Sequence, residues 1–243
     1  MTEWNDGETA RLALIEDRDG QDPAAQLARA AELLDEVKRG VRGPTLRLYR
    51  PRPTMAFGQR DTRLPGFAAA EAASLAGGFV PVVRKAGGRA AAYHEGTLIV
   101  DHIEPAREAM VGHRHRFEVF GELYAGALRT LGVDARVGEI PGEYCPGEYS
   151  VHGVPGERST TTALVKLVGT AQRVVAGAWL FSSVIVVSDA APVRAVLTDV
   201  YRALELPFEP STAGAADELV PGLTVDDVEA ALLAMYREHG ALA

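Results

Sequence analysis

Residues 164–187 read LVKLVGTAQRVVAGAWLFSSVIVV, and this stretch decides the fold. Two apolar runs, Leu164 to Val175 and Ala178 to Val187, flank the dipeptide Ala176-Gly177. Runs rich in valine and aromatic residues on either side of a glycine-containing turn are typical of a β-hairpin. Because the first run holds small residues from Gly169 to Ala171, we expect this hairpin to leave open space beside the sheet.

The rest of the chain alternates irregularly between helical and strand patterns. Asp22-Pro23 resembles a helix N-cap followed by proline, and Gly40 ends the apolar positions that follow at helical spacing. Arg116 to Leu131 is predicted to be an amphipathic helix. Further helices are predicted at 67–76, at 190–204 and from Thr224 onward, and strands at 45–49, 79–83, 90–93, 97–102, 135–137 and 149–152.

This alternation predicts an α/β fold of the α+β type, with a mixed β-sheet flanked by helices. We expect residues 1–21 to form a polar N-terminal segment and residues 22–243 to form a single domain. A chain of 243 residues with 47% hydrophobic side chains is long enough to bury the core of one large domain.

Charge and cysteine content argue against several classes of protein. The net charge of -8 argues against broad binding to nucleic acid or to anionic membranes. The single cysteine cannot form an internal disulfide, the N-terminus does not resemble a signal peptide, and the longest apolar run is too short to span a bilayer. We therefore expect a cytoplasmic protein without nucleic-acid or membrane partners.

The only cysteine, Cys145, lies in the segment GEYCPGEYS at residues 142–150. Its neighbours indicate a thiol in an exposed loop, and the alternative is a buried, inert cysteine. Lys166 has the positive charge or the base that a thiol nucleophile needs, and the alternative is a strand lysine that points to solvent. If both side chains stand at one site, the chain is an acyl-transfer enzyme that works through a thioester.

A second candidate segment, VVRKAGGRAAAYHEGTL, spans residues 82–98. The paired glycines let a ligand approach the backbone and its N–H groups, and the three alanines leave room for a chain. The alternative is a plain hairpin turn with a satisfied histidine. The basic run from His113 to Arg116 is interpreted as a solvated helix start, because no cysteine or acidic ligand stands at a useful spacing for a metal.

These segments together resemble the biotin/lipoate protein ligase and lipoyl transferase superfamily. The family segment Arg-x-x-Gly-Gly-Gly/Arg-x-x-x-x-His is matched by Arg84, Gly87, Gly88, Arg89 and His94. The family segment Lys-x-x-Gly-x-Ala-Gln-Arg is matched by Lys166, Gly169, Ala171, Gln172 and Arg173. Residues 54–59 are similar to an early strand of the family, and Cys145-Pro146-Gly147-x-Tyr149 resembles the nucleophile segment of its amidotransferase branch.

The resemblance implies a ligase-like catalytic domain that moves an octanoyl or lipoyl group through a thioester on Cys145 to the lysine of a lipoyl carrier domain. It implies Lys166 as the second catalytic residue, and no required cofactor or metal. The substrate-binding residues that it implies are Arg84, Gly87, Gly88, Arg89, His94, Gly169, Thr170 and Ala171. The implied partners are lipoyl domains of 2-oxoacid dehydrogenases, the glycine-cleavage H protein or an acyl carrier protein.

Two alternatives belong to other classes of function. An ATP-dependent lipoate ligase would need ATP and Mg²⁺, with Arg89 placed to meet a phosphate, and a non-catalytic relative would only bind an acyl group or its carrier. Biotin ligation is weaker, because the glycine-rich biotin signature is absent. Residues 151–165 are longer than the tight turn usual before the family lysine, which leaves the geometry of that segment open. The acyl donor, the preference between octanoyl and lipoyl groups, and the oligomeric state are also open.

Overall fold

The computed structural model describes residues 11–17 and 22–242, which form two β-sheets and five α-helices. The helices are α1 (Pro23–Lys38), α2 (Phe67–Ala76), α3 (His113–Thr130), α4 (Ala190–Ala203) and α5 (Val225–Glu238). The strands are β1 (Ala13–Asp17), β2 (Thr45–Tyr49), β3 (Thr54–Phe57), β4 (Val80–Val83), β5 (Ala91–Tyr93), β6 (Thr97–Ala106), β7 (Asp134–Val137), β8 (Val151–Val154), β9 (Val165–Val175) and β10 (Gly177–Val186). Three short 3-10 turns complete the described elements: η1 (Asp61–Arg63), η2 (Pro210–Thr212) and η3 (Ala216–Glu218).

The larger sheet has seven strands in the order β1-β2-β6-β10-β9-β8-β7. All neighbours in it are antiparallel except β1 and β2, so the sheet is mixed, as the sequence predicts. The predicted hairpin is β9 and β10, which pair from Ala178 opposite Val175 to Ile185 opposite Val168. β10 pairs with β6 on its other side, so the hairpin lies within the sheet.

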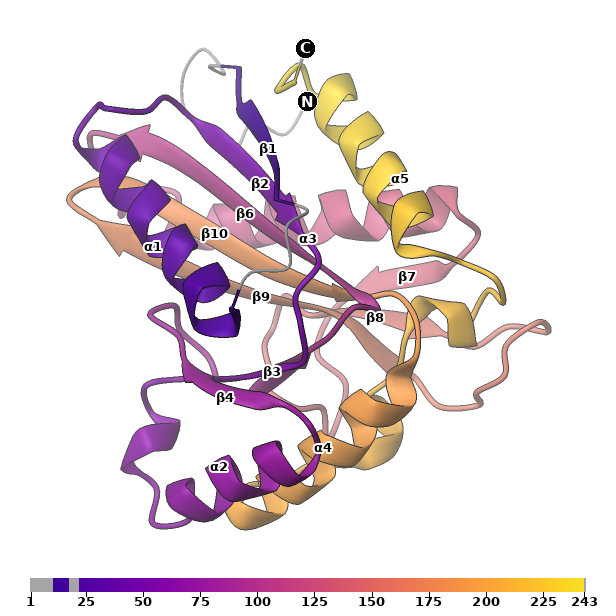
Figure 1. Ribbon diagram of the computed structural model, residues 1–243. Helices are drawn as coiled ribbons and strands as arrows, with labels where there is room; N and C mark the ends of the chain where they lie inside the picture. Colours follow the sequence, from indigo (N-terminus) through magenta and orange to yellow (C-terminus); the bar gives the residue numbers. More distant parts are fainter. Residues whose placement is uncertain (1–10, 18–21, 243) are drawn as a thin grey trace.

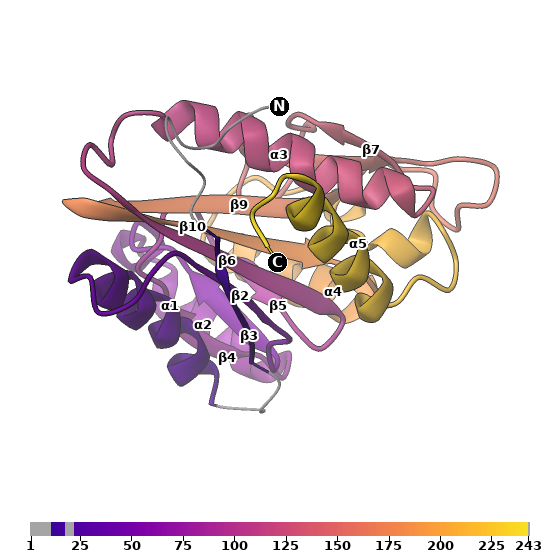
Figure 2. The same ribbon diagram turned by 90° about the horizontal axis from the view of Figure 1, so that it is seen from above.

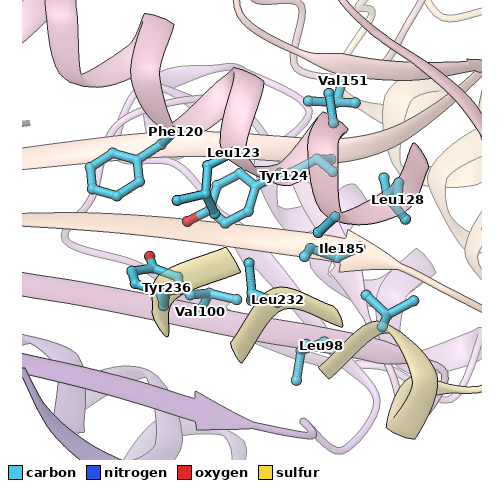
Figure 3. Close-up of a cluster of buried hydrophobic side chains, with 14 of the residues drawn as sticks. Leu98, Val100, Phe120, Leu123, Tyr124, Leu128, Val151, Ile185, Leu232 and Tyr236 are labelled. Atoms are coloured by element: carbon cyan, nitrogen blue, oxygen red, sulfur yellow. The ribbon is translucent and has the colours of Figure 1, made fainter. Parts of the chain in front are cut away.

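The helices form layers on both faces of this sheet (Figures 1 and 2). α3 and α5 cover one face, while α1 and the three-stranded sheet β4-β3-β5 lie on the other. α2 and α4 pack together below the smaller sheet. The main apolar cluster fills the space between α3, α5 and the larger sheet, as Figure 3 shows for Phe120, Leu128 and Leu232 among others.

Helix starts follow the capping chemistry that the sequence predicts. The Asp22 carboxylate accepts hydrogen bonds from the N–H groups of Ala24 and Ala25 at 3.1 and 3.2 Å. Thr224 and Asp227 form a reciprocal capping box at the start of α5. Both signals are local, which is why they can be read from sequence.

Four predicted boundaries are wrong. The strand predicted at 149–152 is β8, which begins and ends two residues later. Residues 13–17 pair in parallel with β2, so part of the segment expected to be separate belongs to the larger sheet; residues 1–10 and 18–21 of that segment lie outside the described residues. β6 extends to Ala106, because the polar residues that interrupt its apolar pattern are buried with partners; His102, for example, contacts Glu104. α3 starts at His113, and buried Arg116 donates to the Ala109 and Val111 carbonyls before it.

In the part of the chain that the structure describes, no helix has both the length and the apolar content needed to cross a membrane.

Candidate active site

A cavity of about 430 Å³ lies at one edge of β9. β8 pairs with β9 only from Val165 to Val168, and beyond that point β10 is the only described strand that pairs with β9. The cavity occupies the edge left open at Gly169 and is closed by five other segments: the β4–β5 turn, β5, the start of α3, the β7–β8 loop and β10. Cys145 and Lys166 both line it.

Cys145 lies in the long loop between β7 and β8 and is half-buried. Its φ is 44°, in the left-handed region that costs a residue with a side chain about 1–3 kcal/mol and persists only where neighbours hold it. Its N–H donates to the Tyr201 hydroxyl at 2.7 Å, and that hydroxyl donates to the Ala90 carbonyl at 3.0 Å. The thiol is therefore placed by contacts to α4 and β5 as well as by its own loop.

Glu143 holds the loop together from inside. Its side chain is fully buried, and its Oε1 accepts hydrogen bonds from Ser150 Oγ at 2.6 Å and from the Gly147 N–H at 3.1 Å. The same oxygen lies 3.1 Å from Lys166 Nζ. A buried carboxylate needs such partners, because leaving it unpaired costs several kcal/mol, on the order of 3–5.

Lys166 reaches from β9 into the same loop. Besides Glu143, its Nζ donates to the Tyr144 carbonyl at 2.9 Å and to the Cys145 carbonyl at 2.8 Å. It also lies 4.9 Å from the centre of the Tyr144 ring, a cation–π distance. The solvent-facing alternative for Lys166 is wrong, since the residue is 1% exposed.

The turn between β4 and β5 covers the other side of the sulfur. The Arg89 N–H donates to Cys145 Sγ at 3.1 Å. Gly88 adopts a φ of 98°, and a Cβ on it would lie 2.5 Å from Arg84 Nη2 and 2.9 Å from Cys145 Sγ. Only glycine fits there, because a side chain would collide with both groups.

Small residues of β9 form a wall of the cavity. Gly169, Thr170 and Ala171 all line it, as the sequence predicts. A Cβ on Gly169 would lie 3.3 Å from Val184 Cγ1 and 3.7 Å from Lys166 Cε, so larger side chains at this position would fill the part of the cavity beside Val184. The wall therefore leaves room for an apolar chain next to the thiol.

Three of the predicted substrate-binding residues do not line the cavity. His94 is a satisfied structural histidine: its Nε2 contacts the Asp189 carbonyl at 2.8 Å and its Nδ1 accepts the Gly96 N–H at 2.7 Å. The Arg89 side chain pairs with buried Asp61 at 3.1 Å, so only its backbone N–H reaches the site. Gly87 is not among the lining residues either, because the turn presents Gly88 instead.

Several residues of the site carry no signal that a single sequence reveals. Glu143, Tyr144 and Tyr201 hold the loop through contacts between distant segments. The basic run at the start of α3 is exposed at residues 113–115, as the sequence predicts, whereas Arg116 is buried. His113 and Arg114 also line the cavity beside Phe117 and Tyr149, whose rings stack 5.8 Å apart. The segment 151–165, whose geometry the sequence left open, forms β8 and its connection to β9, with Thr160 bonded to the Glu218 carbonyl.

Within the described ranges, no group of three or more histidine, cysteine, aspartate or glutamate side chains is arranged to hold a metal ion.

A family model described as the lipoyl protein ligase A/B catalytic domain matches residues 22–237. An octanoyl-[GcvH]:protein N-octanoyltransferase from Geobacillus kaustophilus is 30% identical over 119 residues, a match that covers 49% of this chain and 42% of the relative. One from Exiguobacterium sibiricum is 28% identical over 209 residues, covering 80% of this chain and 71% of the relative. The first match thus spans less than half of the relative's length.

Among solved structures, a bi-partite lipoate protein ligase with its E2 lipoyl domain from Thermoplasma acidophilum has a similar fold. The TM-score is 0.67 at 20% sequence identity, and the superposition covers 96% of this chain and 85% of that one. This likeness confirms the predicted ligase-like α/β architecture.

Proposed function

Because the chain belongs to the lipoyl protein ligase A/B catalytic domain family, we propose that it is an octanoyltransferase that works through a thioester on Cys145. The observation that carries the proposal is the cavity in which the thiol, Lys166 and a wall of small residues meet. The names of the matched relatives support the octanoyl group and indicate octanoylated GcvH, the glycine-cleavage H protein, as the donor.

The reaction is an exchange between two amides. The Cys145 thiol loses its proton, and the sulfur attacks the carbonyl carbon of an octanoyl-lysine on the donor protein. The C–N bond breaks, the departing lysine amine takes a proton, and the acyl group stays on sulfur. The neutral amine of a second carrier's lysine then attacks the thioester, the C–S bond breaks, and the sulfur recovers a proton. Since one amide is replaced by another, no ATP is consumed.

The residues around the sulfur suit this sequence of steps. The Arg89 N–H, 3.1 Å from Sγ, is positioned to stabilise negative charge on the sulfur or on the oxygen of the acyl carbon that the sulfur attacks. Such a preorganised donor typically contributes about 3–4 kcal/mol to the transition state. The pairing of the Arg89 side chain with Asp61 supports the transferase over a ligase in which that arginine meets a phosphate.

The apolar wall suits a medium-length acyl chain. Burying each methylene against Gly169 and Ala171 contributes on the order of 0.8 kcal/mol. The same wall would accept the lipoyl group, which has the same carboxyl end and a similar length. We propose a lipoyl domain as the acceptor, supported by the E2 lipoyl domain that accompanies the Thermoplasma ligase.

The proposal is tested by incubating the purified chain with octanoylated GcvH and an apo lipoyl domain, without ATP or Mg²⁺. Intact-mass measurement is expected to show the octanoyl group moving from GcvH to the lipoyl domain, and lipoylated GcvH tests the alternative acyl group. A parallel reaction contains free octanoate, ATP and Mg²⁺. Modification only in that second reaction, with release of pyrophosphate, would show that the chain is a ligase. Tight carrier binding without transfer in either reaction would identify a non-catalytic relative.

The independence from cofactors and the cytoplasmic location expected from the sequence stay predictions. Adding a chelator to the first reaction tests the former, and transfer that stops on chelation contradicts it.

A further inference from the structure

Lys166 is the obvious cation for the thiol, yet its hydrogen bonds are already used. An ammonium group has three N–H donors. Those of Lys166 face Glu143 Oε1 and the carbonyls of Tyr144 and Cys145, all within 3.1 Å. To donate to the sulfur or to a substrate oxygen, Lys166 would have to release one of the contacts that hold the Cys145 loop.

A second cation, Arg84, lies near the sulfur. Arg84 Nη2 and Cys145 Sγ press on the same side of Gly88, 2.5 and 2.9 Å from the position that a Cβ would take. Arg84 Nη2 donates to the Arg89 carbonyl at 2.7 Å, while the N–H of that same residue donates to Sγ. Arg89 thus links the guanidinium to the thiol through its backbone. Gly88 has no side chain that could stand between the two groups.

Arg84 is fixed at this place and stays charged. Its Nη1 donates to the Tyr93 hydroxyl at 3.0 Å, and it is 9% exposed. Within the described part of the chain, its buried Nε has no hydrogen-bond partner, so one donor is available. Burial lowers the pKa of Arg84, but the neighbouring Tyr93 and Cys145 side chains raise it by more than burial lowers it, so the net shift is upward.

We propose that Arg84 is a catalytic residue whose guanidinium stabilises the thiolate of Cys145, while Lys166 and Glu143 act as positioning residues that fix the loop. This inference rests on the proposed use of Cys145 as the nucleophile. In the first step the proton leaves Sγ, and the guanidinium and the Arg89 N–H face the resulting charge. When the sulfur attacks the acyl carbon, that charge passes to the carbonyl oxygen, and the N–H groups of Arg84 without another partner, Nε–H among them, are available to it.

The other ionisable groups around Cys145 are paired, buried as neutral groups, or exposed at the cavity mouth. At the mouth, Arg114 pairs with Glu148 and His113 is exposed at the start of α3. Glu143 and Lys166 face each other beneath the loop backbone. Tyr144 and Tyr201 are buried, and burial raises the pKa of both, so they stay neutral around pH 7. The Arg89 guanidinium is paired with Asp61. Among these cations, Arg84 should therefore have the largest effect on the charge near the sulfur when it is removed.

The test measures how fast iodoacetamide alkylates Cys145 at pH 5 to 10, by intact mass, in the full chain. Iodoacetamide is neutral, and the thiolate displaces iodide to form a thioether, so the pH midpoint of the rate reports the thiol pKa. An opposite charge at contact distance typically shifts a pKa by about 1–3 units. We expect Arg84→Gln to raise the midpoint by at least about one unit and to slow alkylation at pH 7 roughly tenfold. Arg84→Lys, which keeps the charge, should recover most of that rate.

Lys166→Gln is the matched comparison. It should raise the midpoint less than Arg84→Gln does and lower the melting temperature more, because it leaves buried Glu143 without its partner. A larger midpoint shift for Lys166→Gln, or no shift for Arg84→Gln, overturns the assignment.

Two features keep the test decisive. If Arg84→Gln does not fold, Arg84→Met takes its place in the comparison with Lys166→Gln, and an unshifted midpoint for that variant overturns the assignment. The assay also needs no acyl donor. Failure of octanoyl transfer therefore counts against the proposed function, whereas an unshifted alkylation profile counts against the role of Arg84.

Discussion

On one side of the cavity the β7–β8 loop is held by hydrogen bonds and a buried ion pair, whereas on the other side β9 is held by strand pairing and apolar burial. The loop places Cys145 in a left-handed conformation through Glu143 and Tyr201. β9 contributes small residues that keep the cavity open. Lys166 belongs to both sides, because its backbone lies in β9 and its ammonium group ends in the loop.

The difference assigns separate tasks to the two sides. Polar contacts are directional, so they set the position and the charge of the thiol. Apolar burial depends on area and volume, so β9 sets which acyl chain fits. Variants of the loop should change the chemistry at sulfur, and variants of β9 should change the fit of the chain.

The largest effect is expected where the two sides join. Lys166→Met removes three hydrogen bonds and leaves the fully buried Glu143 carboxylate unpaired. The free energy of unfolding should fall by about 3–5 kcal/mol, measured by urea denaturation, and octanoyl transfer should be lost. Lys85→Met, at an exposed position, is the control and should keep wild-type stability. A Lys166→Met protein as stable as the wild type would mean that the ion pair does not hold the loop.

The next effect separates fit from chemistry. Gly169→Leu should reduce octanoyl loading of Cys145 at least about 100-fold, because the side chain fills the space beside Val184 and excludes several methylenes worth on the order of 0.8 kcal/mol each. The rate of alkylation by iodoacetamide, which needs no acyl pocket, should stay close to that of the wild type.

Gly43→Leu is the control for this variant, since Gly43 is exposed and nothing lies within 4 Å of an added Cβ. A butyryl donor sharpens the test. Because a four-carbon chain needs less of the pocket, Gly169→Leu should reduce butyryl loading less than it reduces octanoyl loading. Normal octanoyl loading of Gly169→Leu would contradict the assignment of the small residues of β9 as the wall of the acyl pocket.

A smaller effect is expected at His94, which packs away from the cavity. His94→Ala removes the contacts to the Asp189 carbonyl and the Gly96 N–H, both of which are only partly buried. Unfolding should become easier by about 1 kcal/mol while the KM for the octanoylated donor stays the same. An increase in KM without loss of stability would instead show that His94 takes part in substrate binding.

The smallest effect is expected at the cavity mouth. Arg114 is 70% exposed and bridges the Tyr149 hydroxyl and Glu148, both on the rim formed by the Cys145 loop. Exposed ion pairs contribute little to stability and are screened by salt. Arg114→Ala should leave the melting temperature unchanged and alter transfer rates only at low ionic strength. A change that persists at 0.5 M salt would indicate a direct role in holding the substrate.

The same contrast explains what the sequence reveals. The predicted hairpin agrees with β9 and β10 within one residue at each end, because apolar runs and a glycine turn are local signals. Cys145, Lys166 and the small residues of β9, which the sequence predicts to form one site, line one cavity, and their catalytic and substrate-binding roles stay predictions.

The contacts of the loop could not be predicted in this way. Glu143 stands two residues before the cysteine like any surface glutamate, and only the folded loop shows that it meets Ser150 and Lys166. His94 fits a family pattern, but the pattern does not reveal that its ring faces Asp189. The roles of polar residues depend on partners that are far apart in sequence, so they appear only in three dimensions.

The central claim is that the acyl group passes through the sulfur of Cys145. Intact-mass measurement of the chain after brief incubation with octanoylated GcvH, quenched in acid, tests this most directly. The account predicts one octanoyl adduct on the wild-type chain that hydroxylamine removes and that Cys145→Ala lacks. Transfer to a lipoyl domain by Cys145→Ala at the wild-type rate, or an adduct that persists in that variant, would contradict it.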